Sequence, residues 1–265
     1  MYGAILGDII GSPYEFDMGD KTKDFPLFID RCDFTDDTVM TLAVGDAFAK
    51  AIKQNADDEA AEVLLEEKMW ELGREYPDRG YGGRFILWLA DPEMKAYNSF
   101  GNGSAMRVSS VAWLYDDLES VRHAAVLSAA VTHNHPEGIK GAEATAAAIY
   151  MARTGKTKAE IRSYIEEEFG YDLSRTCDEI RPDYYHVESC METVPEAITA
   201  FLEGENFEDV IRTAVSLGGD CDTLTAIAGS IAEGFYGVPE ELKARCREYL
   251  PERLLKILDE VMEGR

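Results

Sequence analysis

The chain has 265 residues, of which 46% are hydrophobic, enough for one globular domain with a substantial apolar core. Its 51 Asp and Glu residues outnumber 26 Lys and Arg residues, so the formal net charge at pH 7 is −25. A surface this acidic repels phosphate backbones and anionic lipids, which argues against nucleic-acid and membrane partners. An anionic small substrate would need local help from a metal ion or from helix N-termini.

The cysteines and the N-terminal segment indicate a cellular compartment. The five cysteines are odd in number and show no CxxC spacing, which predicts a reducing compartment without disulfides or a cysteine zinc site. The segment from Met1 to Phe16 is apolar but lacks a basic start, and Asp8 interrupts it, so we expect no signal peptide. No apolar run approaches the ~20 residues of a membrane span. We therefore expect a cytoplasmic protein.

Helical periodicity dominates the chain. After a Gly-rich N-terminal helix, apolar residues from Asp36 to Ile52 recur at i, i+3 and i+4 along one broad face. The same pattern predicts helices at about 57–74, 104–116, 119–131, 137–153, 157–169, 192–203, 206–217, 222–234, 238–248 and 251–263. Only "YYHVESC" at 184–190 resembles a strand. The sequence thus predicts an all-α fold in a single compact multi-helix domain over residues 1–265, with roughly ten helices.

The loop after the N-terminal helix carries Glu15, in "GSPYEF". Taken alone, this residue is an ordinary surface carboxylate. The next segment, "FTDDTVM", opens a helix with Thr35 as a favourable N-cap and with Asp36 and Asp37 in the first turn, where carboxylates meet the helix dipole. Capping alone would explain this pattern.

The middle of the chain holds three glycine- or histidine-containing turns. The first, "RGYGGRF" at 79–85, predicts a loop to which we assign no function. In "SFGNGSAMRV", Gly101 and Gly103 free backbone N–H groups before a helix start, a pattern that binds phosphate oxygens but is also common in plain Asn-Gly turns. In "THNHPEG", His133 and His135 lie between two helices and are explained equally well by helix capping.

A second acidic helix start appears late in the chain. In "GGDCDTLTA", Asp220, Asp222 and Thr223 sit at a loop-to-helix junction. If this start meets the one at Asp36 and Asp37, four carboxylates share a pocket and raise one another's pKa values unless a cation neutralises them. Oxygen ligands alone suit Mg²⁺ or Mn²⁺ rather than Zn²⁺, and four carboxylates suffice for two ions. Spacing by itself leaves open whether the two starts converge.

Five segments, taken in order, closely resemble the ADP-ribosylglycohydrolases: "GAILGDIIGSPYEF", "FTDDTVMTLA", "NSFGNGSAMRV", "THNHPEGIKGA" and "LGGDCDTLTAIAGSIAEGFYG". The resemblance covers the chain from about residue 2 to 237. It implies an all-α fold with a dinuclear magnesium site in a central cleft. The metal ligands that it implies are Thr35, Asp36, Asp37, Asp220, Asp222 and Thr223.

The resemblance also implies a substrate and a reaction. The turn of Gly101, Asn102 and Gly103 matches the one that holds the diphosphate and a ribose of ADP-ribose, with the amides through Ser104 adding positive potential. His133 matches a histidine beside the substrate. The implied reaction is hydrolysis at C1″ of the distal ribose in an ADP-ribosylated small molecule or protein. It would use two Mg²⁺ ions, or Mn²⁺. We assign the catalytic centre to Asp36, Asp37, Asp222 and Glu15, the last of which matches a glutamate that in some members lies on a mobile loop near the metals and would gate or position the substrate.

One position concerns the linkage that is cleaved. Members that act on ADP-ribosyl-arginine tend to carry aspartate where this chain has Ser99, so the resemblance favours serine-linked ADP-ribose or O-acetyl-ADP-ribose. Two alternatives stay open at this stage. One is a catalytically silent ADP-ribose-binding or structural protein of the same fold, and the other is a two-metal phosphoesterase.

Overall fold

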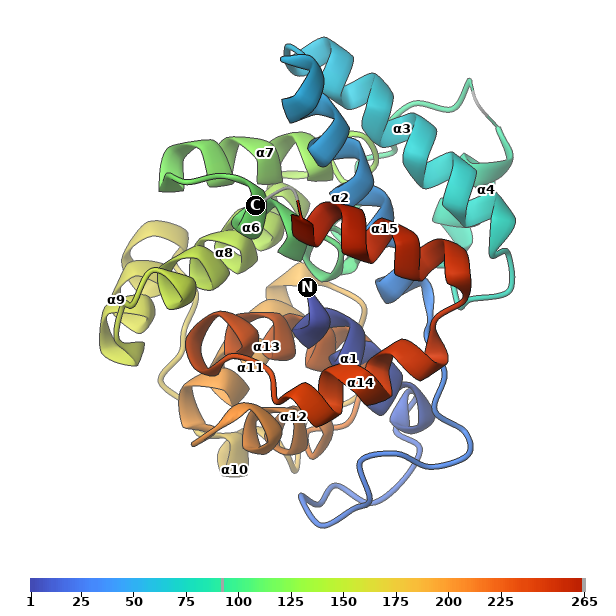
Figure 1. Ribbon diagram of the computed structural model, residues 1–265. Helices are drawn as coiled ribbons and strands as arrows, with labels where there is room; N and C mark the ends of the chain where they lie inside the picture. Colours follow the sequence, from blue (N-terminus) through green and yellow to red (C-terminus); the bar gives the residue numbers. More distant parts are fainter. Residues whose placement is uncertain (92, 264–265) are drawn as a thin grey trace.

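The regular structure is helical throughout the part of the chain that the computed structural model describes, residues 1–91 and 93–263 (Figure 1). In these ranges it has fifteen α-helices and two 3₁₀ turns, and no strand. The predicted all-α fold is confirmed. The number of helices exceeds the predicted ten because several short helices, such as α10 (Cys177–Ile180), are too brief to show periodicity.

Two helices from opposite ends of the chain form the centre of the molecule. Helix α1 (Tyr2–Gly11) is buried along its whole length and packs antiparallel against α13 (Cys221–Tyr236) (Figure 1). Glycines make this approach possible. A Cβ atom at Gly7 would lie 2.2 Å from the Thr225 carbonyl oxygen, and one at Gly11 would lie 2.6 Å from the Asp222 Cα atom. The end of α1 therefore lies directly against the start of α13.

A second layer brings the other acidic helix start to the same place. Helix α2 (Asp36–Gln54) packs against α1, α3 (Asp58–Glu75) and α15 (Glu252–Glu263). Its N-cap is Thr35, whose hydroxyl accepts a hydrogen bond from the Asp37 amide at 3.4 Å. The Asp36 amide donates to the Arg79 carbonyl oxygen at 2.7 Å, so a loop from a distant segment closes this helix end.

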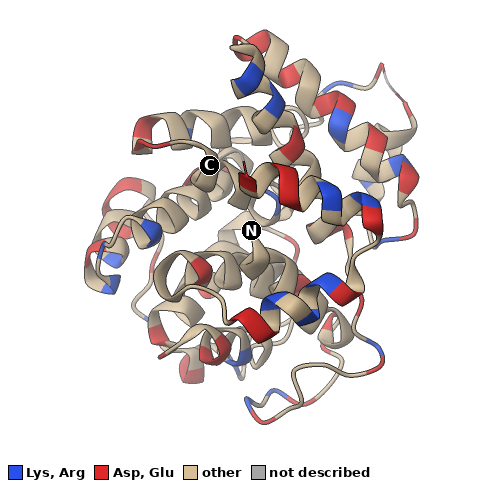
Figure 2. Cartoon of the chain, viewed as in Figure 1, with Lys and Arg blue, Asp and Glu red and all other residues tan. Residues whose placement is uncertain are grey.

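The remaining helices surround this centre. Helices α8 (Pro136–Arg153), α11 (Cys190–Glu203) and α12 (Phe207–Val215) pack on α13, and α14 (Glu240–Tyr249) packs on α1. The others are α4 (Gly83–Ala90), α5 (Gly103–Met106), α6 (Val111–Leu114), α7 (Leu118–Ala130) and α9 (Lys158–Phe169), with 3₁₀ turns η1 (Ser12–Tyr14) and η2 (Val108–Ser110). Buried apolar side chains from all these layers form one continuous core. Acidic side chains are spread over the outer helices, with fewer basic ones between them (Figure 2).

One local expectation was wrong. The helix predicted at 104–116 is divided into α5, η2 and α6. At the break, the buried Arg107 donates to the Ser128 carbonyl oxygen at 2.7 Å and to the Thr132 hydroxyl at 2.8 Å. Tertiary contacts of this kind override local helix propensity. The segment 184–190 forms no strand but an isolated bridge between Gly101 and Ser189.

None of the helices in the described part of the chain combines the length and the hydropathy that a bilayer crossing requires.

Candidate active site

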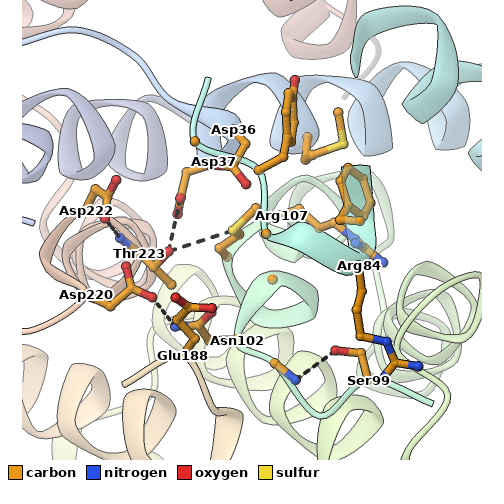
Figure 3. Close-up of a pocket in the computed structure, with 18 of the residues that line it drawn as sticks. Asp36, Asp37, Arg84, Ser99, Asn102, Arg107, Glu188, Asp220, Asp222 and Thr223 are labelled. Atoms are coloured by element: carbon orange, nitrogen blue, oxygen red, sulfur yellow. Dashed lines mark hydrogen bonds between the residues drawn. The ribbon is translucent and has the colours of Figure 1, made fainter. Parts of the chain in front are cut away.

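A cavity of about 440 Å³ opens where the two acidic helix starts meet (Figure 3). It is lined by the first turn of α2, the first turn of α13, the segments 80–85 and 97–107, and individual side chains from elsewhere. Of the residues predicted for the site, the following line the cavity: Glu15, Asp36, Asp37, Ser99, Gly101, Asn102, Gly103, His133, Asp220, Asp222 and Thr223. Two predicted residues, Thr35 and Ser104, are not among the residues that line it.

The meeting of the two helix starts is direct. The Thr223 hydroxyl donates a hydrogen bond to Asp37 Oδ2 at 3.0 Å, and the Thr35 hydroxyl lies 3.5 Å from the same oxygen. The other carboxylate oxygen of Asp37, Oδ1, is buried and has no hydrogen-bond partner among the described residues. Convergence, which spacing left open, is thus a property of the fold, and it leaves a buried oxygen with unused acceptor capacity.

Asp8, on α1, is a site residue that the sequence interpretation missed. Its carboxylate is fully buried and accepts hydrogen bonds from both the amide and the hydroxyl of Thr35 and from both groups of Thr38. It therefore holds the start of α2 in place. The signal was present, because a lone carboxylate inside the apolar helix "GAILGDIIG" needs buried partners. We used it only to argue against a signal peptide.

The α13 side of the cavity is held by a second set of hydrogen bonds. The side-chain Nδ2 of Asn102 donates to Asp220 Oδ2 at 2.6 Å and to the Thr193 hydroxyl at 3.0 Å. The predicted phosphate-turn asparagine thus faces a carboxylate. Glu15, in the loop after η1, also reaches this side: oxygens of Glu15, Asp220 and Asp222 lie within 4.8 Å of one another. A second triplet, formed by Asp8, Asp37 and Asp222, meets the same limit, so Asp222 belongs to both.

Burial and mutual repulsion raise the pKa values of these acids. Burial, and then the charge of Asp222, raises the pKa values of Asp36 and Asp37 well above the ordinary value. Burial, and then Asp220, does the same for the pKa of Asp222. Burial raises the pKa of Asp220 to about 7, and burial with the Asp222 charge raises the pKa of Glu15 to about 7. Without a cation, several of these carboxyl groups would hold protons at neutral pH.

The glycine turn and the histidine form the opposite wall. The Ser99 hydroxyl accepts from the Gly101 amide at 3.1 Å. Cβ atoms at Gly101 and Gly103 would lie 3.4 and 3.2 Å from His133 Nε2, so the bare backbone makes room for this ring. The Ser104 hydroxyl instead donates to the Gly138 carbonyl oxygen at 2.7 Å and is directed away from the cavity. Burial, and then Arg107 and Arg84, lowers the pKa of His133 well below its ordinary value, so the ring is neutral.

The stretch "RGYGGRF", to which the sequence interpretation gave no function, lines the cavity. Its final residues begin α4, and Gly80 has a φ of +90° beside Asp36. The Tyr81 hydroxyl is buried without a partner among the described residues, and Arg84 also borders the cavity. The prediction of a functionless loop missed this, because the contact with Asp36 depends on tertiary packing that local sequence does not reveal.

The fold and the site match one known family. A model of the family described as ADP-ribosylglycohydrolase matches residues 1–265. The chain belongs to the ADP-ribosylglycohydrolase family. The family and enzyme class predicted from the sequence are confirmed.

Individual relatives are similar over most of their length. ADP-ribosylhydrolase ARH3 of Bos taurus is 28% identical, over 93% of this chain and 87% of the relative. ADP-ribosylarginine hydrolase Tri1 of Pseudomonas putida is 27% identical, over 90% of this chain and 70% of the relative. A solved structure described as an ADP-ribosylglycohydrolase-related protein complex superposes with a TM-score of 0.71 and 22% identity, covering 99% of this chain and 95% of its own. That last likeness concerns the fold alone.

The residues present fit divalent metal ions. The donors are carboxylate and hydroxyl oxygens, which suit a hard cation. The unpartnered Asp37 Oδ1 and the raised pKa values of the surrounding acids both describe a site that lacks positive charge. Two carboxylate triplets, each with oxygens within 4.8 Å of one another, share Asp222. Asp36 lines the cavity but belongs to neither triplet.

Proposed function

We propose that this ADP-ribosylglycohydrolase hydrolyses the C1″ glycosidic bond of an ADP-ribosylated small molecule or protein, in a reaction that depends on two Mg²⁺ ions, and releases ADP-ribose. The observation that carries the proposal is the meeting of the α2 and α13 starts, joined by the hydrogen bond from Thr223 to Asp37. Family membership supports the same reaction class.

The metal ligands would be the residues predicted for that role: Thr35, Asp36, Asp37, Asp220, Asp222 and Thr223. When bound, Mg²⁺ or Mn²⁺ would supply positive charge for the ribose hydroxyls and lower the pKa of a water molecule. Asp8 would position the metal ligands of the α2 start, because its four hydrogen bonds fix Thr35 and Thr38 and therefore the direction of this helix end.

Side chains of the protein would transfer the protons in the reaction. Hydrolysis breaks the bond between C1″ and the acceptor, adds the water oxygen to C1″, and returns one proton to the acceptor through an oxocarbenium-like state. Glu15 is half-buried at the cavity edge, with a carboxylate oxygen within 4.8 Å of oxygens of Asp220 and Asp222, a position from which it would give or take a proton during the reaction. One of the aspartates would accept the proton of the attacking water.

The opposite wall would bind the rest of the substrate. The backbone at Gly101 and Gly103 lies open to the cavity beside the neutral His133. Ser104 would contribute its amide only, because its hydroxyl is engaged with Gly138. Ser99, in the position where arginine-specific members tend to carry aspartate, favours serine-linked ADP-ribose or O-acetyl-ADP-ribose over the arginine linkage.

The test is release of ADP-ribose, measured by chromatography, from serine-linked and arginine-linked ADP-ribosyl peptides and from O-acetyl-ADP-ribose. We expect release with Mg²⁺ that is lost on EDTA treatment and in Asp36→Asn. Tight ADP-ribose binding without release from any substrate would instead identify a silent binding protein. Release of inorganic phosphate from a phosphate monoester such as p-nitrophenyl phosphate, without ADP-ribose release, would identify a phosphoesterase. A clear preference for the arginine-linked peptide would overturn the role given to Ser99.

A further inference from the structure

Two arginines line the cavity without a carboxylate partner. Arg84 and Arg107 are its only Lys or Arg residues, and neither forms an ion pair with any acid in the described ranges. The chain has 51 acidic and 26 basic side chains, and in the described ranges most of the basic ones do pair with an acid. Sixteen other Lys and Arg side chains are paired in the described structure, for example Arg122 with Glu143 and Arg247 with Asp259.

The two arginines differ in what they can offer a ligand. Arg107 is buried, and its guanidinium group is already engaged with the Ser128 carbonyl and the Thr132 hydroxyl. Arg84 is exposed at the cavity rim. One of its N–H groups, on Nη2, donates to the Tyr97 carbonyl oxygen, and the guanidinium carbon lies 4.7 Å from the centre of the Tyr97 ring. Its other donors remain available to a ligand.

The contacts to Tyr97 keep the Arg84 side chain in a defined place. Tyr97 is itself held by its amide, which donates to the Thr132 carbonyl oxygen at 3.2 Å, and it lies two residues before Ser99. Arg84 is therefore anchored at the start of the glycine turn. A guanidinium group held in this way loses less conformational freedom when it binds an anion than a free surface side chain would.

Charge divides the cavity into two ends. The carboxylates of Asp37, Asp220 and Asp222 occupy one end, and Arg84 and Ser99 lie at the other (Figure 3). The charges of Arg84 and Arg107 both act on His133, where they add to the effect of burial in lowering its pKa. ADP-ribose has the complementary order, with its anionic diphosphate next to the distal ribose that carries the scissile bond.

We infer that Arg84 binds the diphosphate of the ADP-ribosyl substrate through its free guanidinium donors and so positions the distal ribose over the carboxylates. This inference rests on the proposed function. It gives the positive charge that an anionic substrate needs near a protein of net charge −25, at a place independent of the metal ions. Arg84 is thus a positioning residue whose effect falls on binding and not on bond cleavage.

The experiment compares Arg84→Gln and Arg84→Lys with the unchanged metal-loaded protein. Arg245→Gln, on α14 and outside the cavity lining, is the control for the change in net charge. Binding of ADP-ribose is measured by calorimetry, binding of uncharged adenosine by NMR titration, and KM and kcat from ADP-ribose release. Retention of the fold is checked by thermal unfolding, and the exposed position of Arg84 favours it.

For Arg84→Gln we expect ADP-ribose affinity to fall about 10- to 100-fold, as for loss of a hydrogen bond to a charged group, with adenosine affinity unchanged. KM should rise by the same factor and kcat should stay within about threefold. Arg84→Lys keeps the charge but not the planar fork, so it should lose about tenfold or less. If Arg84→Gln does not fold, Arg84→Lys decides the question. The inference then requires that its affinity for ADP-ribose falls more than its affinity for adenosine.

Equal losses for ADP-ribose and adenosine would overturn the inference and give Arg84 only a packing role against Tyr97. Unchanged ADP-ribose affinity would also overturn it. If the unchanged protein releases ADP-ribose and Arg84→Gln has no effect on binding or KM, the proposed function stands and the inference fails. If ADP-ribose binding depends on Arg84 but no substrate is hydrolysed, the inference stands and the proposed function fails.

Discussion

Helices α2 and α9 begin with the same local chemistry. Each has a threonine N-cap followed by acids in the first turn: Thr35 before Asp36 and Asp37, and Thr157 before Glu160. Each threonine hydroxyl accepts a backbone hydrogen bond, at 3.4 Å in α2 and 3.2 Å in α9. Judged by the threonine cap alone, the two starts are similar, although only in α9 does an acid, Glu160, also accept from the threonine amide and complete a capping box.

Their electrostatic states are opposite. Glu160 is exposed, and hydrogen bonds from the Thr157 amide and hydroxyl lower its pKa to about 2. Asp37 is buried, and its pKa lies well above the ordinary value because of burial and the nearby Asp222 charge. A solvated cap stabilises its helix, whereas the α2 start holds a buried acid beside a second acid, which makes ionisation of either one unfavourable unless a cation is present. Burial and the second acidic start, and not the capping pattern, distinguish a functional site from an ordinary helix end.

The largest expected effect comes from removing the residue shared by both carboxylate triplets. Asp222→Ala should abolish Mg²⁺ binding and lower kcat by more than the about 10- to 100-fold typical of outer-shell ligand partners. The metal-free protein should stay folded, since the change removes a buried carboxyl group whose ionisation is opposed by burial and by Asp220. Calorimetric Mg²⁺ titration and ADP-ribose release check this. The matched control is Glu160→Gln, which should leave both unchanged. Normal turnover by Asp222→Ala would refute the metal-centred account.

A smaller loss of Mg²⁺ affinity should follow from replacing Asp8, which holds the α2 start in place. Asp8→Asn replaces a carboxylate oxygen with an NH₂ group that cannot accept the bonds from Thr35 and Thr38. We expect Mg²⁺ affinity to fall about 10- to 100-fold. Asp33→Asn, an exposed acid near the same helix, is the control and should bind Mg²⁺ normally. Unchanged affinity in Asp8→Asn would show that the α2 start holds its direction without this residue.

Much of this comparison could be predicted from sequence. Hydrophobic periodicity predicts long helices such as α2 and α8. The order of the five motifs identified the family. Sequence spacing could not show that Asp37 and Thr223 meet, because that contact depends on the glycine-mediated packing of α1 on α13. The resemblance supplied this contact in advance, whereas the residues alone did not.

Other parts of the site were missed for a related reason. Asp8 was visible only as a charge in an apolar helix, and Arg84 lay in a stretch predicted to be a loop without function. Both contact residues outside their own helices, Asp8 at Thr35 and Arg84 at Tyr97. Local patterns report on a residue's own element, so roles that arise between elements need the packing to be known.

The thermal unfolding midpoint of the metal-free protein should depend on pH, by a few degrees. Folding raises the pKa of Asp220 from 3.8 to about 7, of Glu15 from 4.5 to about 7, and of Asp8 from 3.8 to about 6. Between pH 4 and 7 the folded state therefore binds more protons than the unfolded state, so the free energy of unfolding falls as pH rises. Exposed acids with lowered pKa values, such as Glu160, act in the opposite direction, but below this window.

Thermal unfolding in EDTA should show this trend as a midpoint that drops by about 4 °C or more from pH 5 to pH 7.5, since about 1 kcal/mol corresponds to roughly 2–4 °C in a chain of this size. Saturating Mg²⁺ should raise the midpoint at pH 7.5 and flatten the slope. A midpoint that is constant, or that rises with pH in EDTA, would contradict the assignment of raised pKa values to the cavity acids.

The smallest effect separates capping from function at the two compared helix starts. Thr157→Ala removes the hydroxyl that caps α9 and should cost about 1 kcal/mol of stability, a fall of roughly 2–4 °C in the unfolding midpoint. Mg²⁺ affinity and turnover should stay unchanged, because α9 contributes nothing to the cavity lining. Thr35→Ala removes the same group from α2 and should weaken Mg²⁺ binding as well, since that hydroxyl also contacts Asp8 and Asp37. If both variants lose only stability, Thr35 is a cap like Thr157 and is not part of the metal site.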